Sequence, residues 1–502
     1  MKGLRLHNSL SGDKEPFEPL HPPFVGLYVC GPTVYNDVHL GNCRTFLTFD
    51  ILRRWLTWLG YRVRYVRNIT DVGHLENDAD DGEDKIGKKA RLEQLEPMEV
   101  VQRYTVGFHE VMQRLNILPP SIEPTATGHI IEQIQMVEKI LEQGLAYVVN
   151  GSVYFDVQAF EKRVGGYGAL SGRKLDELIA GAGAGRRTLE GQDEKRHPAD
   201  FALWKKASPQ HIMRWPSPWG EGFPGWHIEC SAMSTKYLGA EFDIHGGGFD
   251  LKFPHHECER AQNLACTGQG GPRYWMHSNM LTVQGKRMGK SEGNALWPRD
   301  IFSGDHPLLP RAYSPMTLRY MMMQAHYRST LDFTPDALEA ADKNLAKIRE
   351  ALGFLPHLTG SGVSDFSWSS WQDSLFEALN DDLNVPLACA RLLEGLKHLH
   401  QVAHKQAHIS EEDLEALRSF LPRFVEEVLG LQIQATAPSD ASALQALENV
   451  MGLLIQLRNE ARVSRNYALA DQIRDRLQKV GIQLADSREG TTWHLQGSSS
   501  VS

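Results

Sequence analysis

The sequence has no run of about 18 consecutive apolar residues, which a membrane-spanning helix would require. Its first twenty residues, MKGLRLHNSLSGDKEPFEPL, contain no apolar core and no cleavage pattern, so they do not predict a secretory signal. These two absences predict a cytoplasmic protein that has no membrane partner.

Cysteine is scarce, and neither sign of charge dominates. Six cysteines among 502 residues are too few for a disulfide framework, so in a reducing compartment they indicate metal or thiol chemistry. A net charge of −9 excludes attraction to nucleic acid over the whole surface, so any RNA contact must come from a local patch. The length predicts three or four domains.

A complete P-loop is also missing. The segment VQGKRMGKSEGN (residues 283–294) contains Gly289, Lys290 and Ser291, which is how a P-loop ends. That loop needs another glycine five residues before Gly289, and the residue there is Gln284. Lys290 therefore requires a different explanation.

Alternating strand and helix patterns predict an α/β fold. Residues 23–35 form an apolar strand that ends in a Gly-Pro turn, residues 39–60 have helical spacing, and residues 61–70 alternate like a strand. This βαβ unit predicts a Rossmann-like, doubly wound parallel sheet. The segment EFDIHGGG (residues 241–248) resumes the sheet, and helical patterns dominate from Leu338 onward.

The segment FPHHECE contains a possible metal-binding pair. Pro254 suits the first turn of a helix, so His255 and Glu259, four residues apart, are expected on one face. His256 and Cys258 are expected to point elsewhere. A surface His–Glu pair without metal is the alternative interpretation.

Two cysteines could complete a zinc site with that pair. Cys30 follows the first strand, and Cys230 lies in GWHIECSAM. With His255 and Glu259 they would provide thiolate, imidazole and carboxylate ligands suited to zinc. The alternative is that both cysteines are small buried hydrophobic residues, and a separation of 200 residues leaves both interpretations open.

The segment HLGN (residues 39–42) lies at the loop-to-helix junction of the first βαβ unit. A helix N-terminus favours phosphate, and His39 and Asn42 could donate hydrogen bonds to phosphoryl oxygens. A helix cap or an ordinary surface histidine is the alternative interpretation of His39.

The segments HLGN and RMGKS resemble the HIGH and KMSKS motifs of class I aminoacyl-tRNA synthetases. Longer segments are similar to the cysteinyl-tRNA synthetase family, in order from about residue 4 to residue 494. They are YVCGPTVYNDVHLGNCRTF, YVRNITDVGHL, GWHIECSAMSTKYLGAEFDIHGGGFDLKFPHHECE, LRYMMMQAHYR, DDLNVPLACARLL and RNEARVSRNYALADQIRDRLQKVGIQLADSREGTTW.

The resemblance implies a role for each candidate residue. It implies one zinc ion, catalytic and ATP-binding residues in the two motifs, a nucleotide contact, and an amino-acid pocket. The zinc ligands would be Cys30, Cys230, His255 and Glu259; the catalytic residues His39, Asn42 and Lys290; the ATP-binding residues His39, Asp250 and Lys290; and the pocket residues Thr70 and Trp226.

Three positions depart from the family pattern. Arg287 replaces the usual first lysine of the second motif, which keeps the charge, and Gly289 replaces a serine, which loosens the loop. Both put loop closure and ATP affinity in question. Cys43 stands where alanine is usual, and the sequence offers no functional account of it.

The resemblance also implies the activity and the domain order. It implies a monomer that joins cysteine to tRNA(Cys) through a cysteinyl-adenylate, using ATP with Mg²⁺. The expected domains are two halves of the catalytic sheet (residues 1–125 and 226–300), a connective insertion (126–225), a stem-contact region (301–345), a helical bundle (346–435) and an anticodon-binding module (442–502).

The last module contains a basic helical pattern over residues 454–479. Charge alone leaves a solvated face and an RNA contact both open, because acidic residues are interspersed, whereas the resemblance implies anticodon binding. Trp493 could stack on a base or belong to a core. The basic residues are Arg458, Arg462, Arg465, Arg474, Arg476 and Lys479.

Three other functions compete with tRNA charging. A ligase that joins cysteine to a sugar amine shares the catalytic core but generally lacks the anticodon-binding module. A non-catalytic RNA-binding paralogue would not need HLGN, Lys290 and the four possible zinc ligands. A structural zinc protein would not need two phosphate-binding motifs.

Overall fold

The computed structural model describes residues 3–73, 84–173, 194–209, 211–288, 294–433, 440–479, 481–487 and 490–495. The chain forms two compact units, Met1–Gln432 and Ile433–Ser502. Lys290 and Gly289 lie outside the described residues.

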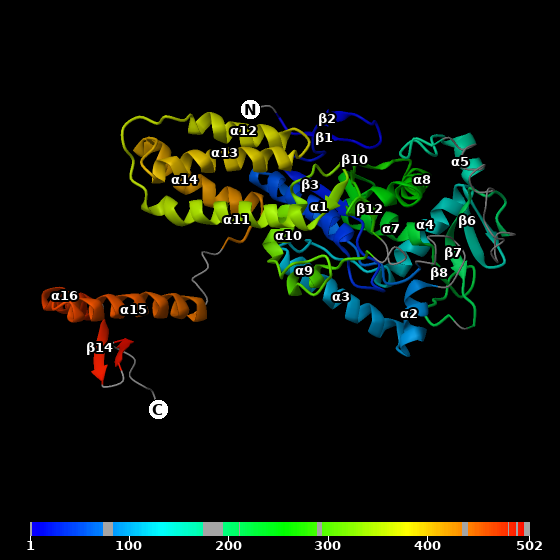
Figure 1. Cartoon of the computed structure of the whole chain (residues 1–502). Coiled ribbons are helices and arrows are strands. Elements are labelled where there is room, and N and C mark those ends of the chain that lie inside the picture. Colours follow the sequence, from blue (N-terminus) through cyan, green and yellow to red (C-terminus); the bar gives the residue numbers. More distant parts are fainter. Residues whose placement is uncertain are drawn as a thin grey trace. The chain divides into compact units, whose positions relative to one another are not determined.

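A four-stranded parallel sheet forms the centre of the first unit (Figure 1). Its order is β10 (Gly271–Ser278), β9 (Glu241–Gly248), β3 (Phe24–Val29) and β4 (Arg62–Arg67). Leu27 pairs with Ile244 between β3 and β9, and both side chains are fully buried. The predicted doubly wound sheet is confirmed.

Helices connect the parallel strands. Helix α1 (Leu40–Trp58) joins β3 to β4, and α8 (His255–Thr267) joins β9 to β10. One βαβ unit therefore runs outward from β3 and the other runs outward from β9, so the strand order reverses between these two strands. Ligands bind at such a switch point in doubly wound folds.

An antiparallel sheet interrupts the parallel one. It consists of β5 (Ala146–Val149), β6 (Ser152–Phe155), β7 (Phe201–Lys206) and β8 (Gly222–Pro224). Its apolar residues pack with those of the surrounding helices into one core that includes Val137, Phe155, Leu203, Trp204 and Ile228. The helices nearby are α4 (Ile130–Glu142), α5 (Val157–Arg163) and α7 (Trp226–Leu238).

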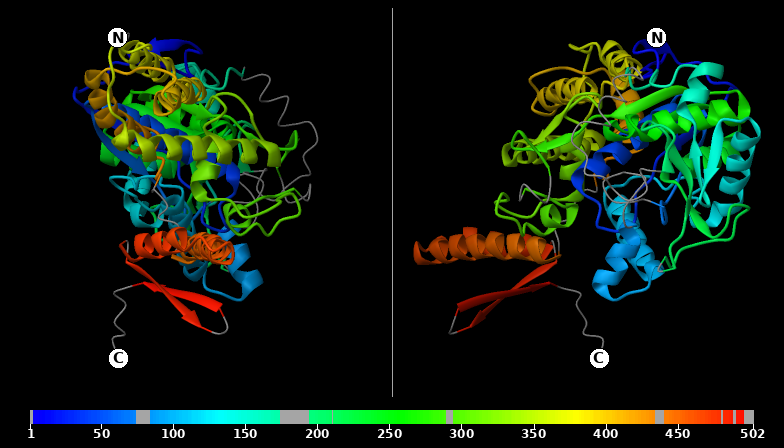
Figure 2. Two further views of the ribbon diagram at one scale, coloured as in Figure 1. Left: turned by 60° about the vertical axis from the view of Figure 1, so that its left-hand side comes forward. Right: turned by 90° about the vertical axis from the view of Figure 1, so that its right-hand side faces the viewer.

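The helical part of the first unit lies at the other end of the parallel sheet (Figures 1 and 2). It contains α11 (Pro335–Phe354), α12 (Trp368–Asn380), α13 (Val385–Ala403), α14 (Glu411–Arg423) and the π-helical turn η6 (Phe424–Val428). The remaining helices of this unit are α2 (Lys85–Glu93), α3 (Pro97–Arg114), α9 (Pro298–Ser303), α10 (Pro315–Met322) and the 3-10 turns η2 (Thr127–His129), η4 (Phe249–Lys252) and η5 (Leu355–His357).

Short strands complete the first unit. Strands β1 (Arg5–His7) and β2 (Lys14–Pro16) form a hairpin, and β11 (Leu281–Val283) lies between β12 (Lys286–Arg287) and β13 (Leu331–Phe333). Helix α3 ends at Arg114. Leu115 and Asn116 leave the helix, and Asn116 has a positive φ of 53°.

A buried ionic group joins α1 to the helical part. Asp50 of α1 accepts hydrogen bonds from Arg54 (2.8 Å) and Arg319 (2.6 Å). Arg319 also donates to the carbonyl oxygen of Leu429 at 2.9 Å, and its side chain is fully buried. Since a buried charge that loses its partner costs about 3–5 kcal/mol, these contacts fix α1 in place.

The second unit is a helical pair followed by a hairpin. It contains α15 (Asp440–Val463), α16 (Tyr467–Lys479), β14 (Ile482–Ser487) and β15 (Gly490–Leu495). The single helix expected over residues 454–479 is therefore wrong, because the chain leaves α15 at Ser464 and Arg465 has a positive φ of 59°.

Two side chains of this unit bear on the earlier alternatives. Trp493 is partly buried and packs against the core of Met451, Leu477 and Ile482. Arg458 is buried and does not belong to the exposed basic surface, whereas Arg474 is exposed and lies near two aspartates. None of the helices in the described residues combines the length and apolarity needed to span a bilayer.

Candidate active site and metal centre

A cleft of about 380 Å³ opens where β3 and β9 end. Most of the candidate residues line it, although they come from distant parts of the sequence. They are Cys30, His39, Asn42, Thr70, Trp226, Cys230, Asp250 and His255. The switch point of the sheet therefore collects the predicted residues in one place.

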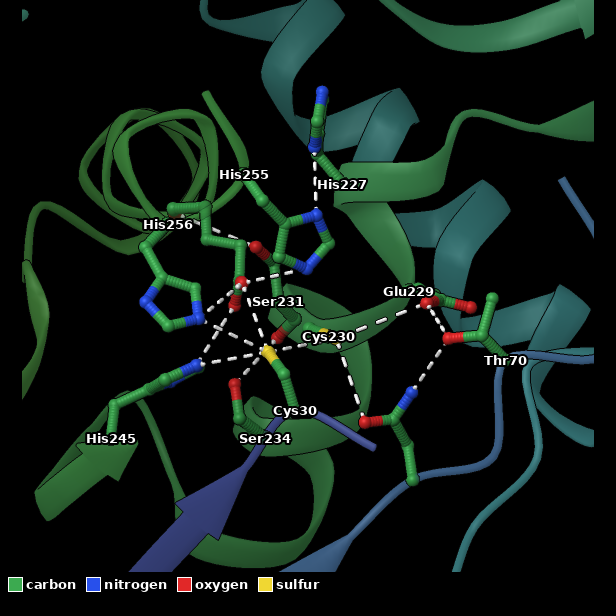
Figure 3. Close-up of polar contacts among 12 residues, drawn as sticks. Cys30, Thr70, His227, Glu229, Cys230, Ser231, Ser234, His245, His255 and His256 are labelled. Carbon is green, nitrogen blue, oxygen red and sulfur yellow. Dashed lines mark hydrogen bonds and ion pairs between the residues drawn. The ribbon is translucent and has the colours of Figure 1, made fainter. Parts of the chain in front are cut away.

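Cys30, Cys230 and His255 line this cleft and form one group with Glu259; Figure 3 shows the two cysteines and His255 close together. Their ligand atoms all lie within 4.8 Å of one another, and all four side chains are buried. The Sγ atoms of Cys30 and Cys230 are 3.6 Å apart, and Nε2 of His255 is 3.1 Å from Oε1 of Glu259. The i,i+4 pair predicted on one helical face is confirmed.

Different elements deliver these four side chains. Cys30 follows β3, Cys230 belongs to α7, and His255 and Glu259 occupy the first turns of α8. Gly31 allows the chain after β3 to pass close to the end of β4, since a Cβ atom there would lie 1.5 Å from the carbonyl oxygen of Asn68. Only glycine fits this close approach of two backbones.

The donor set fits zinc. Burial raises the pKa of the Cys230 thiol to about 12 and that of Glu259 to about 7, and it raises the pKa of Cys30 well above its usual range. Oε2 of Glu259 is buried without a hydrogen bond. Two sulfurs, an imidazole and a carboxylate thus face one another, and a bound divalent metal would stabilise their deprotonated forms.

One expectation about this cluster is wrong. His256 was expected to point elsewhere, yet its Nε2 lies 3.3 Å from Sγ of Cys30, and Nε2 of His245 lies 3.4 Å from the same sulfur. Cys30, His245, His256 and Glu259 form a second set with ligand atoms within 4.8 Å. Both faces of the first turn of α8 are buried: His255 contacts His227 of α7, and His256 contacts His277 of β10.

A polar chain lies beside the cysteines. Asn68 donates to the hydroxyl of Thr70 at 3.1 Å, and this hydroxyl donates to Oε1 of Glu229 (Figure 3). Oε1 of Glu229 is 4.0 Å from Sγ of Cys230. Trp226 lies at the opening, with its ring centroid 4.3 Å from that of His255.

His39 caps the N-terminus of α1. Its Nδ1 accepts hydrogen bonds from the backbone N–H groups of Gly41 (3.1 Å) and Asn42 (3.4 Å), and Oδ1 of Asn42 accepts from the N–H of His39 (3.2 Å). Desolvation by the cleft walls lowers the pKa of His39, although part of the ring is exposed. The neutral ring therefore carries its proton on Nε2, where it can donate.

The second motif, RMGKS, also reaches this cleft through its first two residues, which the structure describes. Arg287 and Met288 line the cleft, and Cε of Met288 is 4.0 Å from the position a Cβ of Gly41 would take. Asp250 is exposed on η4, on another side of the cleft. Lys290 itself is outside the described residues.

Comparison with known proteins identifies the family. A profile described as "tRNA synthetases class I (C) catalytic domain" matches residues 16–343, and a "DALR domain" profile matches residues 376–434. A cysteine–tRNA ligase of Bacteroides fragilis is 53% identical over 492 residues, covering 98% of this chain and 99% of the relative. The chain belongs to the cysteine–tRNA ligase family.

Other cysteine–tRNA ligases match over the same length. That of Phocaeicola vulgatus is 54% identical and that of Chlorobaculum tepidum is 47% identical, with 98% of this chain and 99% of each relative covered. A solved methionyl-tRNA synthetase of Mycobacterium tuberculosis in complex with methionyl-adenylate has a TM-score of 0.56 at 13% identity, covering 84% of this chain and 96% of that one. This likeness shows the class I fold.

Sequence patterns missed three buried residues of this cysteine–tRNA ligase site. His245 precedes the three glycines that end β9, so a histidine at the carboxyl end of a parallel strand was the available signal. His256 was assigned to the wrong face. Glu229 is an acidic residue within GWHIECSAM, and a charged residue inside a buried helix was its signal.

Proposed function

We propose that this chain joins cysteine to tRNA(Cys) in two ATP-dependent steps, with zinc selecting the thiol of the amino acid. One observation carries the proposal: a buried set of two thiols, an imidazole and a carboxylate lies in the same cleft as the helix cap HLGN. Membership of the cysteine–tRNA ligase family supports it.

Cys30, Cys230, His255 and Glu259 would hold the zinc ion. A bound zinc ion would supply a soft Lewis acid that binds a thiolate well and a neutral hydroxyl poorly. Cysteine and serine have similar sizes, and a pocket that measures size separates substrates that differ by one methylene by only about 1–3 kcal/mol. Selection by sulfur chemistry would make a separate editing site unnecessary.

Thr70 and Trp226 would form the rest of the amino-acid pocket. The Trp226 ring lines the cleft beside His255, with the two ring centroids 4.3 Å apart, and the Thr70 hydroxyl donates to Glu229. These side chains would exclude water. They would also orient the carboxylate of cysteine toward the end of the cleft that His39, Asp250 and Arg287 line, which we call the phosphate end.

In the first step the cysteine carboxylate attacks the α-phosphate of ATP. A bond forms between a carboxylate oxygen and this phosphorus, the bond to the bridging oxygen breaks, and pyrophosphate leaves with cysteinyl-adenylate remaining. Nε2–H of His39, the side-chain amide of Asn42 and the ammonium of Lys290 would stabilise the negative charge. Asp250 would lie beside the nucleotide, and Mg²⁺ would accompany ATP.

In the second step a hydroxyl of the terminal ribose of the tRNA attacks the acyl carbon, and AMP leaves. We propose that the unit Ile433–Ser502 contacts the anticodon. Its exposed arginines would supply a local positive surface that the whole chain, at a net charge of −9, does not have. They are Arg462, Arg465, Arg474 and Arg476.

One two-stage assay tests the function. The purified chain is expected to catalyse cysteine-dependent exchange of pyrophosphate into ATP and then to charge purified tRNA(Cys). Serine in place of cysteine should give little exchange. Exchange without charging would favour the sugar-amine ligase, and the absence of both activities would refute the proposal.

A further inference from the structure

Glu229 is a buried carboxylate in the cleft that the reaction described above does not use. It precedes Cys230 on α7 and is 1% exposed, yet it lines the cleft together with Thr70 and Trp226. Oε1 accepts the hydrogen bond from Thr70, and among the described residues Oε2 has no hydrogen-bond partner. One oxygen of this buried carboxylate thus makes no hydrogen bond with the residues that the structure describes.

No cationic side chain among the described residues compensates this carboxylate. Among the described residues its hydrogen bonds come from Thr70 and, at 4.0 Å, from the thiol of Cys230, and both reach Oε1. A buried oxygen without a hydrogen bond is unfavourable, so a donor that reaches Oε2 would form a strong hydrogen bond.

The carboxylate is held in one orientation. Oδ1 of Asn68 accepts a hydrogen bond from the N–H of Gly31 at 2.9 Å, and the amide nitrogen of Asn68 donates to Thr70 at 3.1 Å. Thr70 then donates to Glu229. This series of bonds starts at the backbone, so the receiving oxygen is fixed before any ligand enters.

The position of Glu229 matches the structure of cysteine. Its Oε1 lies 4.0 Å from Sγ of Cys230, one of the proposed zinc ligands. In cysteine only two carbon atoms separate the ammonium nitrogen from the sulfur. A substrate whose sulfur lies at the ligand set therefore has its ammonium within reach of this carboxylate.

We infer that Glu229 binds the α-ammonium group of the cysteine substrate, with Thr70 and Asn68 as positioning residues. This inference rests on the proposed function. Glu229 makes the site specific for an amino acid that carries a thiol, because a thiol without an ammonium group leaves the carboxylate unpaired. The contact is a charge-assisted hydrogen bond.

The test compares two ligands in wild type and in Glu229→Gln. Cysteine KM is measured by pyrophosphate exchange, and 3-mercaptopropionate, which is cysteine without its amino group, is measured as an inhibitor. Cysteine KM should rise about 10- to 100-fold, as expected for a lost hydrogen bond to a charged group. The inhibition constant of 3-mercaptopropionate should stay the same or fall.

The matched control is Glu257→Gln. Glu257 is also a buried carboxylate with one oxygen that makes no hydrogen bond, but it bonds the N–H of Ser171 and does not line the cleft. Its replacement should change cysteine KM less than about threefold. The inference would be overturned by an unchanged cysteine KM in Glu229→Gln, or by equal KM changes in the two variants. It would also be overturned if Glu229→Gln lost cysteine and 3-mercaptopropionate binding equally.

A second measurement needs no variant and covers the case in which Glu229→Gln does not fold. Cysteamine keeps the thiol and the ammonium, whereas 3-mercaptopropionate keeps the thiol and the carboxylate. Cysteamine should inhibit wild type about tenfold more tightly, and equal or weaker inhibition would overturn the inference. Wild type without any cysteine-dependent exchange would instead refute the proposed function.

Discussion

The two ends of the cleft are built in different ways. The sulfur end consists of fully buried side chains from β3, α7, β9 and α8, whose positions the core of the parallel sheet fixes. The phosphate end consists of exposed groups, His39, Asp250 and Arg287, at the edges of short elements. The end that we propose selects the amino acid is buried, and the end that we propose binds the phosphates of ATP is open to solvent.

Removing one of the cysteine ligands should have the largest effect, because it should weaken cysteine binding at one end of the cleft and leave ATP binding at the other end unchanged. In Cys230→Ser we expect cysteine KM to rise about 100-fold or more, because even changes outside the ligand set reduce metal affinity about 10- to 100-fold. ATP affinity should not change. Exchange kinetics measure the cysteine KM and the ATP affinity, and elemental analysis measures the zinc content.

The control for that variant is Cys389→Ser. Cys389 is a buried cysteine of α13, in the helical part of the first unit. It should leave zinc content and cysteine KM unchanged. An unaltered cysteine KM in Cys230→Ser would refute the role of this thiol.

The next effect concerns the phosphate end, where His39 combines capping with a proposed catalytic role. Asparagine caps helices well, so His39→Asn should keep the free energy of unfolding and lower kcat of exchange about 100-fold. His39→Ala should lose about 1 kcal/mol of stability in addition. Chemical unfolding and exchange kinetics separate the two roles, and full activity of His39→Asn would contradict the catalytic one.

A smaller effect is expected in the pH dependence of the metal-free protein. Burial raises the pKa of Glu259 from 4.5 to about 7 in the folded state, so this group stabilises the fold below its unfolded pKa. That contribution, about 3 kcal/mol, is lost as pH rises through the folded pKa near 7. Melting temperatures from pH 5 to 7 should therefore fall more steeply in metal-free wild type than in metal-free Glu259→Gln.

Bound zinc should remove this difference between the two melting-temperature slopes, because a Glu259 carboxylate that ligates the metal no longer binds a proton. Parallel slopes for the two metal-free proteins would show that Glu259 is ionised in the fold without metal.

The smallest effect should come from Arg287→Lys. Arg287 is exposed, and an exposed charge contact contributes at most about 1 kcal/mol. Lysine keeps the charge at that position, so KM for ATP should change less than about fivefold and cysteine KM should not change. A larger change in ATP KM would indicate that the fork-shaped guanidinium makes a bidentate phosphate contact.

The local elements of the phosphate end could be predicted from the sequence. Strand β3, helix α1 and strand β4 follow directly from apolar periodicity, and the position of His39 at a helix N-terminus follows from them. Lys290 and Gly289 lie outside the described residues, so their assignment stays a prediction.

The sulfur end could be predicted only in part. The pair His255 and Glu259 follows from helical spacing, whereas the approach of Cys30 to Cys230 depends on the crossover connections between them. The predicted orientation of His256 was wrong because helical periodicity assumes one buried face, whereas the start of α8 is buried on two faces. Glu229 was missed because no periodicity marks a single charged residue in a buried helix.

The contact between Asp50 and Arg319 determines how the chain can be divided. Helix α1 presents His39 at one end, and its middle is tied through Arg319 to the carbonyl oxygen of Leu429, far beyond the matched catalytic domain. A fragment that stops at residue 343 would leave two buried arginines, Arg54 and Arg319, without some of the carbonyl oxygens that accept their hydrogen bonds. The smallest independent catalyst obtainable from this polypeptide must therefore extend past η6, at least to Leu429.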